Sequence, residues 1–504
     1  MKILLVRAPF EFPAFLGRPD ISFNVPVGLL SIASVLEQNG YSPEVFDSLV
    51  YGEREYHDGN TLRFGASYEQ IQQEIERRHP DVVGIGSHYT TQLYPTLKVA
   101  ESVKRVDPNI VVVVGGAHAS ARPQDFFELT SSVDFACLGE GEYMMLGLIQ
   151  YLEGKKPIDE IENIAYLDKD GKLAIKPYDK IHGSVQDLDE LPFPAYHLVD
   201  MGKYFDFAQK GYMGRTHYKS NRVVTMLTSR GCPFHCCFCA LHLHMSRHFR
   251  GNSPEYVIRH IDYLVKQYNV KHISFEDDTI NANPRRFDRI LDGLIQANLG
   301  ITWDTPNGVR ADLLSREMLI KAKKSGCTFL TIGVESGDQE ILDRVVHKRL
   351  NLADVVQVSK WCHELGIGLT AFFMIGFPGE KKENIERTLE FALMLNRKYD
   401  VIPGFSIARP YYGTDMYETA KSKGYLLKEP TPENLALIER YEQYGENNLI
   451  KTPDFTPEEL KRYRKAFYRK LLLLQMLKPK YYFKSFLTSP TIYLRLARRI
   501  RENV

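Results

Sequence analysis

The chain lacks any run of about 18 consecutive apolar residues, which argues against a transmembrane helix. Residues 1–7 are also too short an apolar stretch for a signal peptide. Neither charge sign dominates, with 64 Lys and Arg against 63 Asp and Glu, so the composition carries no nucleic-acid signature. Apolar residues make up 44% and charged residues 25%, which excludes wholesale disorder and a coiled-coil rod. We therefore expect a cytoplasmic globular protein whose 504 residues form several domains.

Cysteine is scarce, and its odd count of seven argues against full disulfide pairing. Four of the seven lie close together at Cys232, Cys236, Cys237 and Cys239, while the others stand singly in apolar segments. This distribution favours a reducing compartment and a single metal site.

Residues 1–150 alternate between strand patterns and helix patterns. The predicted strands are 2–7, 42–47, 82–86, 110–114 and 135–138, and the predicted helices are 26–39, 68–79, 95–106 and 143–152. This alternation predicts a doubly wound parallel sheet. The first strand–helix turn lacks G-x-G-x-x-G, which disfavours a dinucleotide site.

Parallel sheets bind ligands at the carboxyl ends of their strands. The residues at those ends are Ser87, His88, Gly115, Gly116, His118, Gly139, Glu140 and Gly141. Glycines at three loops allow a large flat ligand to approach the backbone closely. The alternative, that they only form tight turns, stays open here.

The spacing of Cys232, Cys236 and Cys239, Cys-x3-Cys-x2-Cys, supplies three thiolates from one loop. A [4Fe–4S] cluster usually takes four cysteine ligands, so three would leave one iron open to a chelating molecule. Zinc is the alternative, because His235 and His242 lie nearby, but structural zinc sites prefer four closed ligands. We interpret Cys237 as a packing residue that binds no metal.

The following segment repeats strand–helix units. The predicted strands are 222–227, 272–275, 302–307, 328–334, 368–375 and 404–408, and the helices between them are 254–268, 287–297, 318–324, 352–365 and 384–395. Six such units predict an incomplete (β/α)₆ barrel, whose polar strand ends face the active site. The predicted domains are 1–150, a connector 151–220 with a hairpin turn at Asp168–Gly171, the barrel 221–415 and a helical C-terminal region 416–504.

With Phe238 directly before its last cysteine, the cysteine loop resembles the signature of radical S-adenosylmethionine (radical SAM) enzymes. Residues 114–118, 138–142 and 191–194 resemble the cobalamin-binding branch of that family, and the resemblance spans roughly residues 1–415. It implies that Cys232, Cys236 and Cys239 hold a [4Fe–4S] cluster. It also implies that S-adenosylmethionine chelates the open iron and that the N-terminal domain binds cobalamin.

The resemblance implies further site residues in the barrel. Glu335 would contact the ribose or amino group of S-adenosylmethionine, and residues 376–378 would border its adenine. One of the acidic residues 276–278 would lie near the ribose. The set implied to bind cofactor in this half is Phe238, Glu276, Asp277, Arg310, Glu335, Ser336 and Ser406. The alternative for each carboxylate, a solvated loop charge or a helix N-cap, stays open.

The implied activity is cleavage of S-adenosylmethionine to a 5′-deoxyadenosyl radical, with methylation of an unactivated carbon. Oxidative cyclisation or rearrangement, as in anaerobic porphyrin cyclases, uses the same cofactors and stays open. A non-catalytic cobalamin or redox sensor is disfavoured, because the three cysteines are intact. Since Asp-x-His-x-x-Gly is absent, cobalamin is expected to bind without that histidine ligand, and no auxiliary cluster is expected beyond Cys362.

Residues 461–504 hold 13 Lys and Arg and one acidic residue, together with many aromatic and leucine side chains. This pattern predicts a helical cap over the enzyme core, with peripheral contact to anionic lipid as the alternative. The expected substrate is a small or lipid-like molecule, and the resemblance implies an electron donor of the flavodoxin or ferredoxin type.

Overall fold

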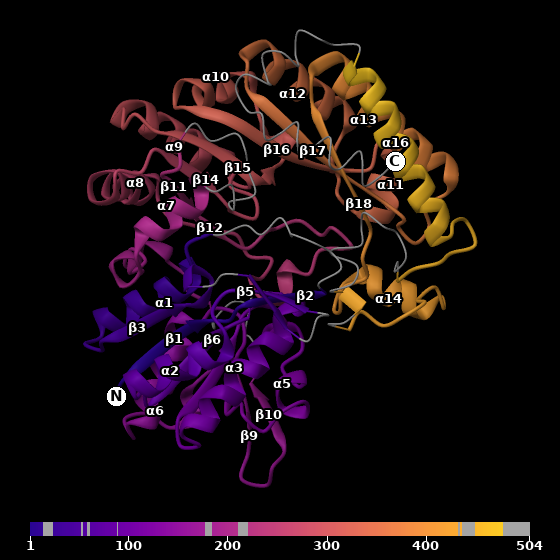
Figure 1. Ribbon diagram of the computed structural model, residues 1–504. Coiled ribbons are helices and arrows are strands. Elements are labelled where there is room, and N and C mark those ends of the chain that lie inside the picture. The colour runs from indigo at the N-terminus through magenta and orange to yellow at the C-terminus, as the bar shows by residue number, and fades with distance from the viewer. Residues whose placement is uncertain are drawn as a thin grey trace.

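The computed structural model describes residues 1–13, 24–51, 54–57, 61–87, 89–176, 184–209, 220–431, 434–435 and 449–476. A seven-stranded sheet forms the N-terminal domain and a six-stranded sheet forms the C-terminal domain, one below the other in Figure 1. Helix α7 (Met201–Gln209) contacts both, since Tyr204 bonds Asp47 and the carbonyl of Phe205 accepts from Asn221. The predicted α/β fold class is confirmed.

Five parallel strands form the centre of the N-terminal sheet, in the order β3-β1-β6-β7-β8. In that order they span Pro43–Asp47, Ile3–Arg7, Val82–Gly86, Val111–Gly115 and Phe135–Cys137. The strand order reverses direction between β1 and β6, which is the position where doubly wound sheets bind ligands.

Both faces of this sheet are covered, as expected for parallel strands. Ile3 and Leu5 of β1 belong to the hydrophobic core on one face, and Leu4 and Val6 belong to the core on the other. Helices α1 and α6 cover the first face and α2 and α3 the second; they span Val27–Gln38, Glu142–Leu152, Tyr68–Arg78 and Leu93–Val106.

Two additions to the N-terminal domain go beyond the prediction. Strands β9 (Ile164–Leu167) and β10 (Leu173–Lys176) continue the main sheet antiparallel to β8, so the sheet extends past residue 150. The predicted turn between them is confirmed, since the N–H of Gly171 donates to the carbonyl of Asp168 at 3.0 Å. A separate three-stranded sheet pairs β2 (Phe10–Pro13), β5 (Thr61–Phe64) and β4 (Arg54–His57).

The C-terminal sheet runs in chain order, β11-β14-β15-β16-β17-β18, and every pair is parallel. Its strands span Val223–Met226, His272–Phe275, Thr302–Val309, Cys327–Glu335, Gly368–Ile375 and Ile402–Ile407. Helices α8, α9, α10, α12 and α13 line its outer side in Figure 1; they span Pro254–Tyr268, Pro284–Ala297, Arg316–Lys324, Leu352–Leu365 and Lys382–Tyr399. The predicted six-unit partial barrel is confirmed.

Local sequence signals explain several boundaries. Helix α8 begins after Ser253, whose hydroxyl accepts a hydrogen bond from the N–H of Tyr256 at 3.1 Å, with Pro254 in its first turn. It ends at Asn269, which adopts the left-handed conformation with φ of 51°.

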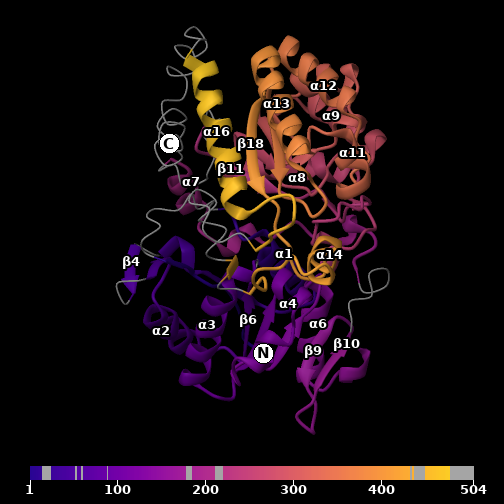
Figure 2. The ribbon, with the colours of Figure 1, turned by 90° about the vertical axis from the view of Figure 1, so that its right-hand side faces the viewer.

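Helix α16 (Pro457–Met476) packs beside β18 and α13 at the open edge of the barrel (Figure 2). The ring centroids of Phe467 on α16 and Phe405 on β18 lie 4.3 Å apart. The predicted helical cap is confirmed up to residue 476, and the rest of the basic tail lies outside the described residues. No helix in the described part of the chain is both long and apolar enough to cross a membrane.

A single hydrophobic core spans both domains. It contains Leu5 and Leu29 from the N-terminal domain, Tyr196 from the connecting segment, and Val224 and Trp303 from the barrel. The two sheets are therefore packed into one body rather than joined by a bare linker.

Candidate active site

The loop that carries the three spaced cysteines is framed by two short strands. β12 (Ser229–Arg230) and β13 (Arg250–Gly251) pair antiparallel and enclose residues 231–249. Gly231 opens the loop with φ of 80°, and a Cβ there would lie 2.3 Å from the carbonyl oxygen of His248. Only glycine therefore fits the position directly before Cys232.

The surroundings of two of the three thiols, those of Cys236 and Cys239, shift their ionisation. The pKa of Cys239 is raised to about 12, mainly by burial and in smaller part by the thiols of Cys236 and Cys232, against a backbone hydrogen bond at Leu241. Burial also raises the pKa of Cys236, against the ammonium of Lys348. Within the described ranges, no three His, Cys, Asp or Glu side chains already stand as a metal-binding group. Since thiolates are the metal-binding form of cysteine, iron binding here would be coupled to the loss of thiol protons.

The neighbours of the thiols separate packing residues from candidate ligands. Cys237 packs in a hydrophobic cluster with Phe377 and Met416, as predicted for a packing residue. The rings of Phe238 and Phe377 lie 5.9 Å apart, which brings the cysteine loop against the turn that follows β17.

Glu335 lies at the carboxyl end of β16 with φ of 69°, an uncommon conformation for a residue other than glycine. Its carboxylate accepts a hydrogen bond from Lys348 Nζ at 2.8 Å, and both side chains are about one-tenth exposed. Burial of Lys348 disfavours its positive charge, but Glu335 and the Cys236 thiol outweigh this effect and raise the pKa of Lys348. Lys348 is thus a site residue that the sequence did not reveal.

Arg310 contacts the cysteine loop through the ring of Phe234. Its guanidinium forms a bidentate pair with Asp312 at 2.9 and 2.8 Å and donates to the carbonyls of Lys348 and Arg349. It also lies 3.9 Å from the ring centroid of Phe234, which stands between the first two cysteines of the motif. Arg310 therefore links the cysteine loop to the backbone of residues 348–349.

The acidic residues after β14 have separate positions. Asp277 is 1% exposed and accepts hydrogen bonds from the backbone and hydroxyl of Thr228 and from Ser229, so it anchors the start of the cysteine loop. Burial and then Asp277 raise the pKa of Asp278 to about 7. Glu276 faces the N-terminal domain, where it accepts a hydrogen bond from Asn24 at 2.8 Å.

The remaining barrel candidates lie at the same end of the strands. Ser336 is fully buried and its hydroxyl lies 3.0 Å from that of Thr388, so it fixes the turn after β16. Ser406 is half-buried on β18, paired in register with Met374 of β17.

The carboxyl edge of the N-terminal sheet lies close to the barrel. Ser87 follows β6 there, and its buried hydroxyl has no hydrogen-bond partner among the described residues. His88 lies outside the described residues. A Cβ at Gly115 would lie 3.1 Å from the Cβ of Cys137, and one at Gly141 would lie 2.7 Å from the Cδ1 of Ile32, so a larger residue at either position would press on its neighbour.

Two further loops at this edge are tied together by polar contacts. Gly116 and Gly139 both have positive φ, at 128° and 76°, and the hydroxyl of Ser120 bonds the backbone of each. His118 is 1% exposed, with Nδ1 3.1 Å from the Thr90 hydroxyl and Nε2 3.2 Å from an Asp125 oxygen. Both ring nitrogens are thus engaged inside the domain.

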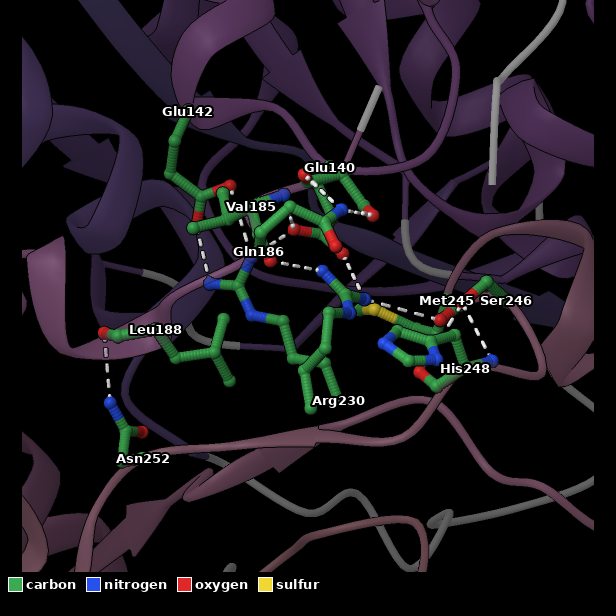
Figure 3. A network of polar contacts seen from close by, with 12 residues as sticks. Glu140, Glu142, Val185, Gln186, Leu188, Arg230, Met245, Ser246, His248 and Asn252 are labelled. Carbon is green, nitrogen blue, oxygen red and sulfur yellow. Dashed lines mark hydrogen bonds and ion pairs between the residues drawn. The ribbon is translucent and has the colours of Figure 1, made fainter. Parts of the chain in front are cut away.

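Glu140, unlike Gly139 and Gly141 beside it, is paired with charged residues of the C-terminal domain. Figure 3 shows it beside Glu142 and Arg230, where Arg230 bonds Glu140 at 2.9 Å and Glu142 at 2.6 Å. Arg250 bonds the other oxygen of Glu140 at 2.5 Å. The sequence shows only that Arg230 stands beside the cysteine motif, and nothing in it pairs Arg230 with a carboxylate 90 residues earlier in the chain.

The residues present fit the cofactors implied by the motif. Three thiols on one loop form a soft donor set for iron–sulfur chemistry. The unpaired buried hydroxyl of Ser87 lies after β6, beside the point where the strand order reverses and a bound ligand is expected.

Comparison with known proteins agrees with this geometry. Residues 226–392 match the radical SAM superfamily and residues 22–149 match the B12 binding domain. The chain is 30% identical over 435 residues to the cytidylyl-2-hydroxyethylphosphonate methyltransferase of Streptomyces wedmorensis, covering 80% of this chain and 78% of that enzyme. It is 29% identical over 471 residues to an uncharacterized methyltransferase of Pyrococcus horikoshii, covering 93% and 92%.

Two further matches bear on fold and chemistry. The anaerobic magnesium-protoporphyrin IX monomethyl ester cyclase of Rubrivivax gelatinosus is 26% identical over 397 residues, covering 78% of this chain and 65% of the cyclase. The radical S-adenosylmethionine methyltransferase TsrM of Kitasatospora setae, solved with tryptophan and an aza analogue of S-adenosylmethionine, superposes with a TM-score of 0.69 at 15% identity, covering 92% and 88%.

The chain therefore belongs to the radical SAM superfamily and is an enzyme of that class. Within the superfamily it belongs to the branch that carries a B12 binding domain, and two relatives that match most of its length are named as methyltransferases.

Proposed function

We propose that this protein is a cobalamin-dependent radical SAM methyltransferase that methylates an unactivated carbon of a small molecule. Bound together, the [4Fe–4S] cluster, S-adenosylmethionine and cobalamin supply the radical and methyl-transfer chemistry. The protein fixes the positions of these groups relative to one another and keeps water away from them. The observation that carries the proposal is the meeting of the two predicted cofactor sites: the three-thiol loop is bonded directly to the carboxyl edge of the B12 binding domain.

The positions of the side chains support the following residue roles. Cys232, Cys236 and Cys239 bind the cluster, and Glu335 with Lys348 supplies paired charges beside it for the polar end of S-adenosylmethionine. Phe238 and the turn at residues 376–378 line the same end of the barrel. Ser87 and the loops 115–118 and 139–141 hold cobalamin. The corresponding domains are 1–150, 151–220, 221–415 and 416–504, with β9 and β10 joined to the first sheet.

The inner face of the barrel supports a substrate with a flat apolar part. On β17 the buried residues Leu369, Ala371 and Phe373 alternate with Phe372, which is 41% exposed on the opposite face. The Phe372 ring lies against Gly404 of the neighbouring strand, where a Cβ would be 3.1 Å from it. Ile402, 39% exposed, faces the same side. A lipid-like or aromatic substrate suits this surface, and the basic tail remains a predicted lipid contact.

Oxidative cyclisation is the second candidate, because the cyclase of Rubrivivax gelatinosus matches this chain over 78% of its length. Both reactions would need a low-potential electron donor of the flavodoxin or ferredoxin type. All seven cysteines are free, which suits a reducing cytoplasm. Product mass separates the candidates, since methylation adds one carbon whereas cyclisation removes hydrogen.

The test is anaerobic reconstitution followed by metal and cofactor analysis. The proposal expects about four irons and one cobalamin per chain. Gly231→Ala should lose most of the iron because its Cβ meets the carbonyl of His248. Gly171→Ala is the matched control, since its φ is 75° but nothing lies within 4 Å of the added Cβ. Zinc in place of iron, or iron without cobalamin, would contradict the proposed chemistry.

A further inference from the structure

Two arginines close the base of the loop that carries the three candidate cluster ligands. Arg230 ends β12 and Arg250 begins β13, and they stand opposite each other in the register of the two strands. Every residue of the cysteine motif lies between them. The position of this base therefore sets the position of the loop relative to the rest of the molecule.

Both arginines are held by carboxylates of the other domain. Glu140 lies between β8 and α6 and Glu142 is the first residue of α6, at the same edge of the N-terminal sheet as Ser87 and Gly115. Arg230 spans the two carboxylates at 2.9 and 2.6 Å (Figure 3). Arg250 bonds the second oxygen of Glu140 at 2.5 Å. Bidentate arginine contacts fix orientation as well as distance.

The group of four charged side chains, Glu140, Glu142, Arg230 and Arg250, is buried and balanced in charge. Glu140, Glu142 and Arg250 are each 5% exposed or less, and two cations face two anions. Burial opposes the charged forms, but the arginines lower the pKa of Glu140 and the carboxylates raise that of Arg230. The contacts therefore favour the charged forms of Glu140 and Arg230.

The connecting segment completes the arrangement. The N–H of Val185 donates to Glu140 at 3.1 Å, and its carbonyl accepts from Arg250 at 2.6 Å. Asn252, two residues after Arg250, donates to the carbonyl of Leu188 at 2.8 Å. Three separate parts of the chain thus meet at one polar centre.

We propose that Glu140, Glu142, Arg230 and Arg250 form an arginine latch that holds the cluster loop and the cobalamin edge at one fixed separation. The four act as positioning residues: their charged groups bond one another, and they orient the loops that hold the two cofactors. This inference rests on the proposed function, because the separation matters only if both sites are filled.

The test uses Arg230→Lys, which keeps the charge but loses the bidentate contact, and Glu142→Gln as a second variant. Lys104→Gln is the control, since it removes an ion pair of 2.7 Å inside the N-terminal domain. In the reconstituted enzyme, pulsed electron paramagnetic resonance measures the separation between the reduced cluster and cob(II)alamin. In the apoprotein, hydrogen exchange is followed at residues 139–142 and 231–249.

The latch predicts full cofactor content with a broadened or shifted separation in both latch variants, and about tenfold faster exchange in both segments. The control should match the wild type in both measurements. An unchanged separation and unchanged exchange in folded latch variants would overturn the inference, even if their melting temperature falls. If the wild type binds no cobalamin, the proposed function fails instead, and the exchange of the two segments alone decides whether the latch exists.

Discussion

Glu380 is a buried carboxyl that the proposed chemistry leaves without a reacting role. It is fully buried, and one oxygen accepts hydrogen bonds from the N–H groups of Gly376 at 2.6 Å and Phe377 at 3.2 Å. Burial raises its pKa to about 8, with Asp338 adding to the effect and the two N–H groups opposing it. The side chain thus holds together the turn that lies against Phe238.

This raised pKa makes stability depend on pH. Between the ordinary glutamate pKa and about 8, the folded chain keeps a proton that the unfolded chain releases, so stability falls as pH rises, by up to about 1.4 kcal/mol per unit. Glu380→Gln should remove this slope while keeping an acceptor for Gly376 and Phe377. Denaturant unfolding from pH 5 to pH 8 should show the variant gaining on the wild type. Glu380→Ala, which leaves both N–H groups unpaired, should be less stable throughout, and parallel curves for Glu380→Gln would contradict the argument.

At the level of elements, α16 covers an edge that the six-stranded barrel leaves open. Phe467 is 1% exposed against Phe405, so Phe467→Ala should cost about 3–5 kcal/mol of unfolding free energy through the cavity it leaves. Leu473 on the same helix is 61% exposed, and Leu473→Ala should change stability by less than about 0.5 kcal/mol. Equilibrium unfolding of both variants checks this, and equal effects would mean that α16 does not pack as described.

The elements most predictable from sequence were those with local signals. The bounds of α8, β14, α12 and β17 were predicted to the residue, because apolar periodicity and caps such as Ser253 mark them. Strands β2, β4 and β5 were missed, since short strands of a small sheet are stabilised by pairing with distant segments. The cysteine loop was equally local and was found from its spacing.

The side-chain partners at the site were not predictable in the same way. Lys348 bonds Glu335 across 13 residues and Arg230 bonds Glu142 across 88, so only the folded chain brings them together. Glu140 was placed correctly at the edge that faces the other domain, yet its role there depends on arginines from the barrel. Arg310 is predicted to lie near the bound cofactor, and its contact with the Phe234 ring of the cysteine loop could not be read from the sequence.

At the level of the whole molecule, two domains with different folds share a hydrophobic core and the buried arginine latch. Such an interface suits an enzyme whose chemistry passes between two bound groups, because relative motion of the domains would change the distance between them. Removing one partner of a buried ion pair typically costs about 3–5 kcal/mol because the other charge stays buried without compensation, so substitution of one of these four residues should weaken the interface.

This shared interior predicts that the two domains unfold together. Both tryptophans, Trp303 and Trp361, lie in the barrel, so their fluorescence reports that domain alone, whereas far-ultraviolet circular dichroism reports both. In denaturant the two signals of the apoprotein should follow one coincident transition. Arg230→Gln, which leaves Glu142 buried without its partner, should lower the midpoint and separate the two curves. A circular dichroism transition in the wild type that is silent in tryptophan fluorescence would show that the N-terminal sheet unfolds by itself, and that the interface is weaker than its buried contacts indicate.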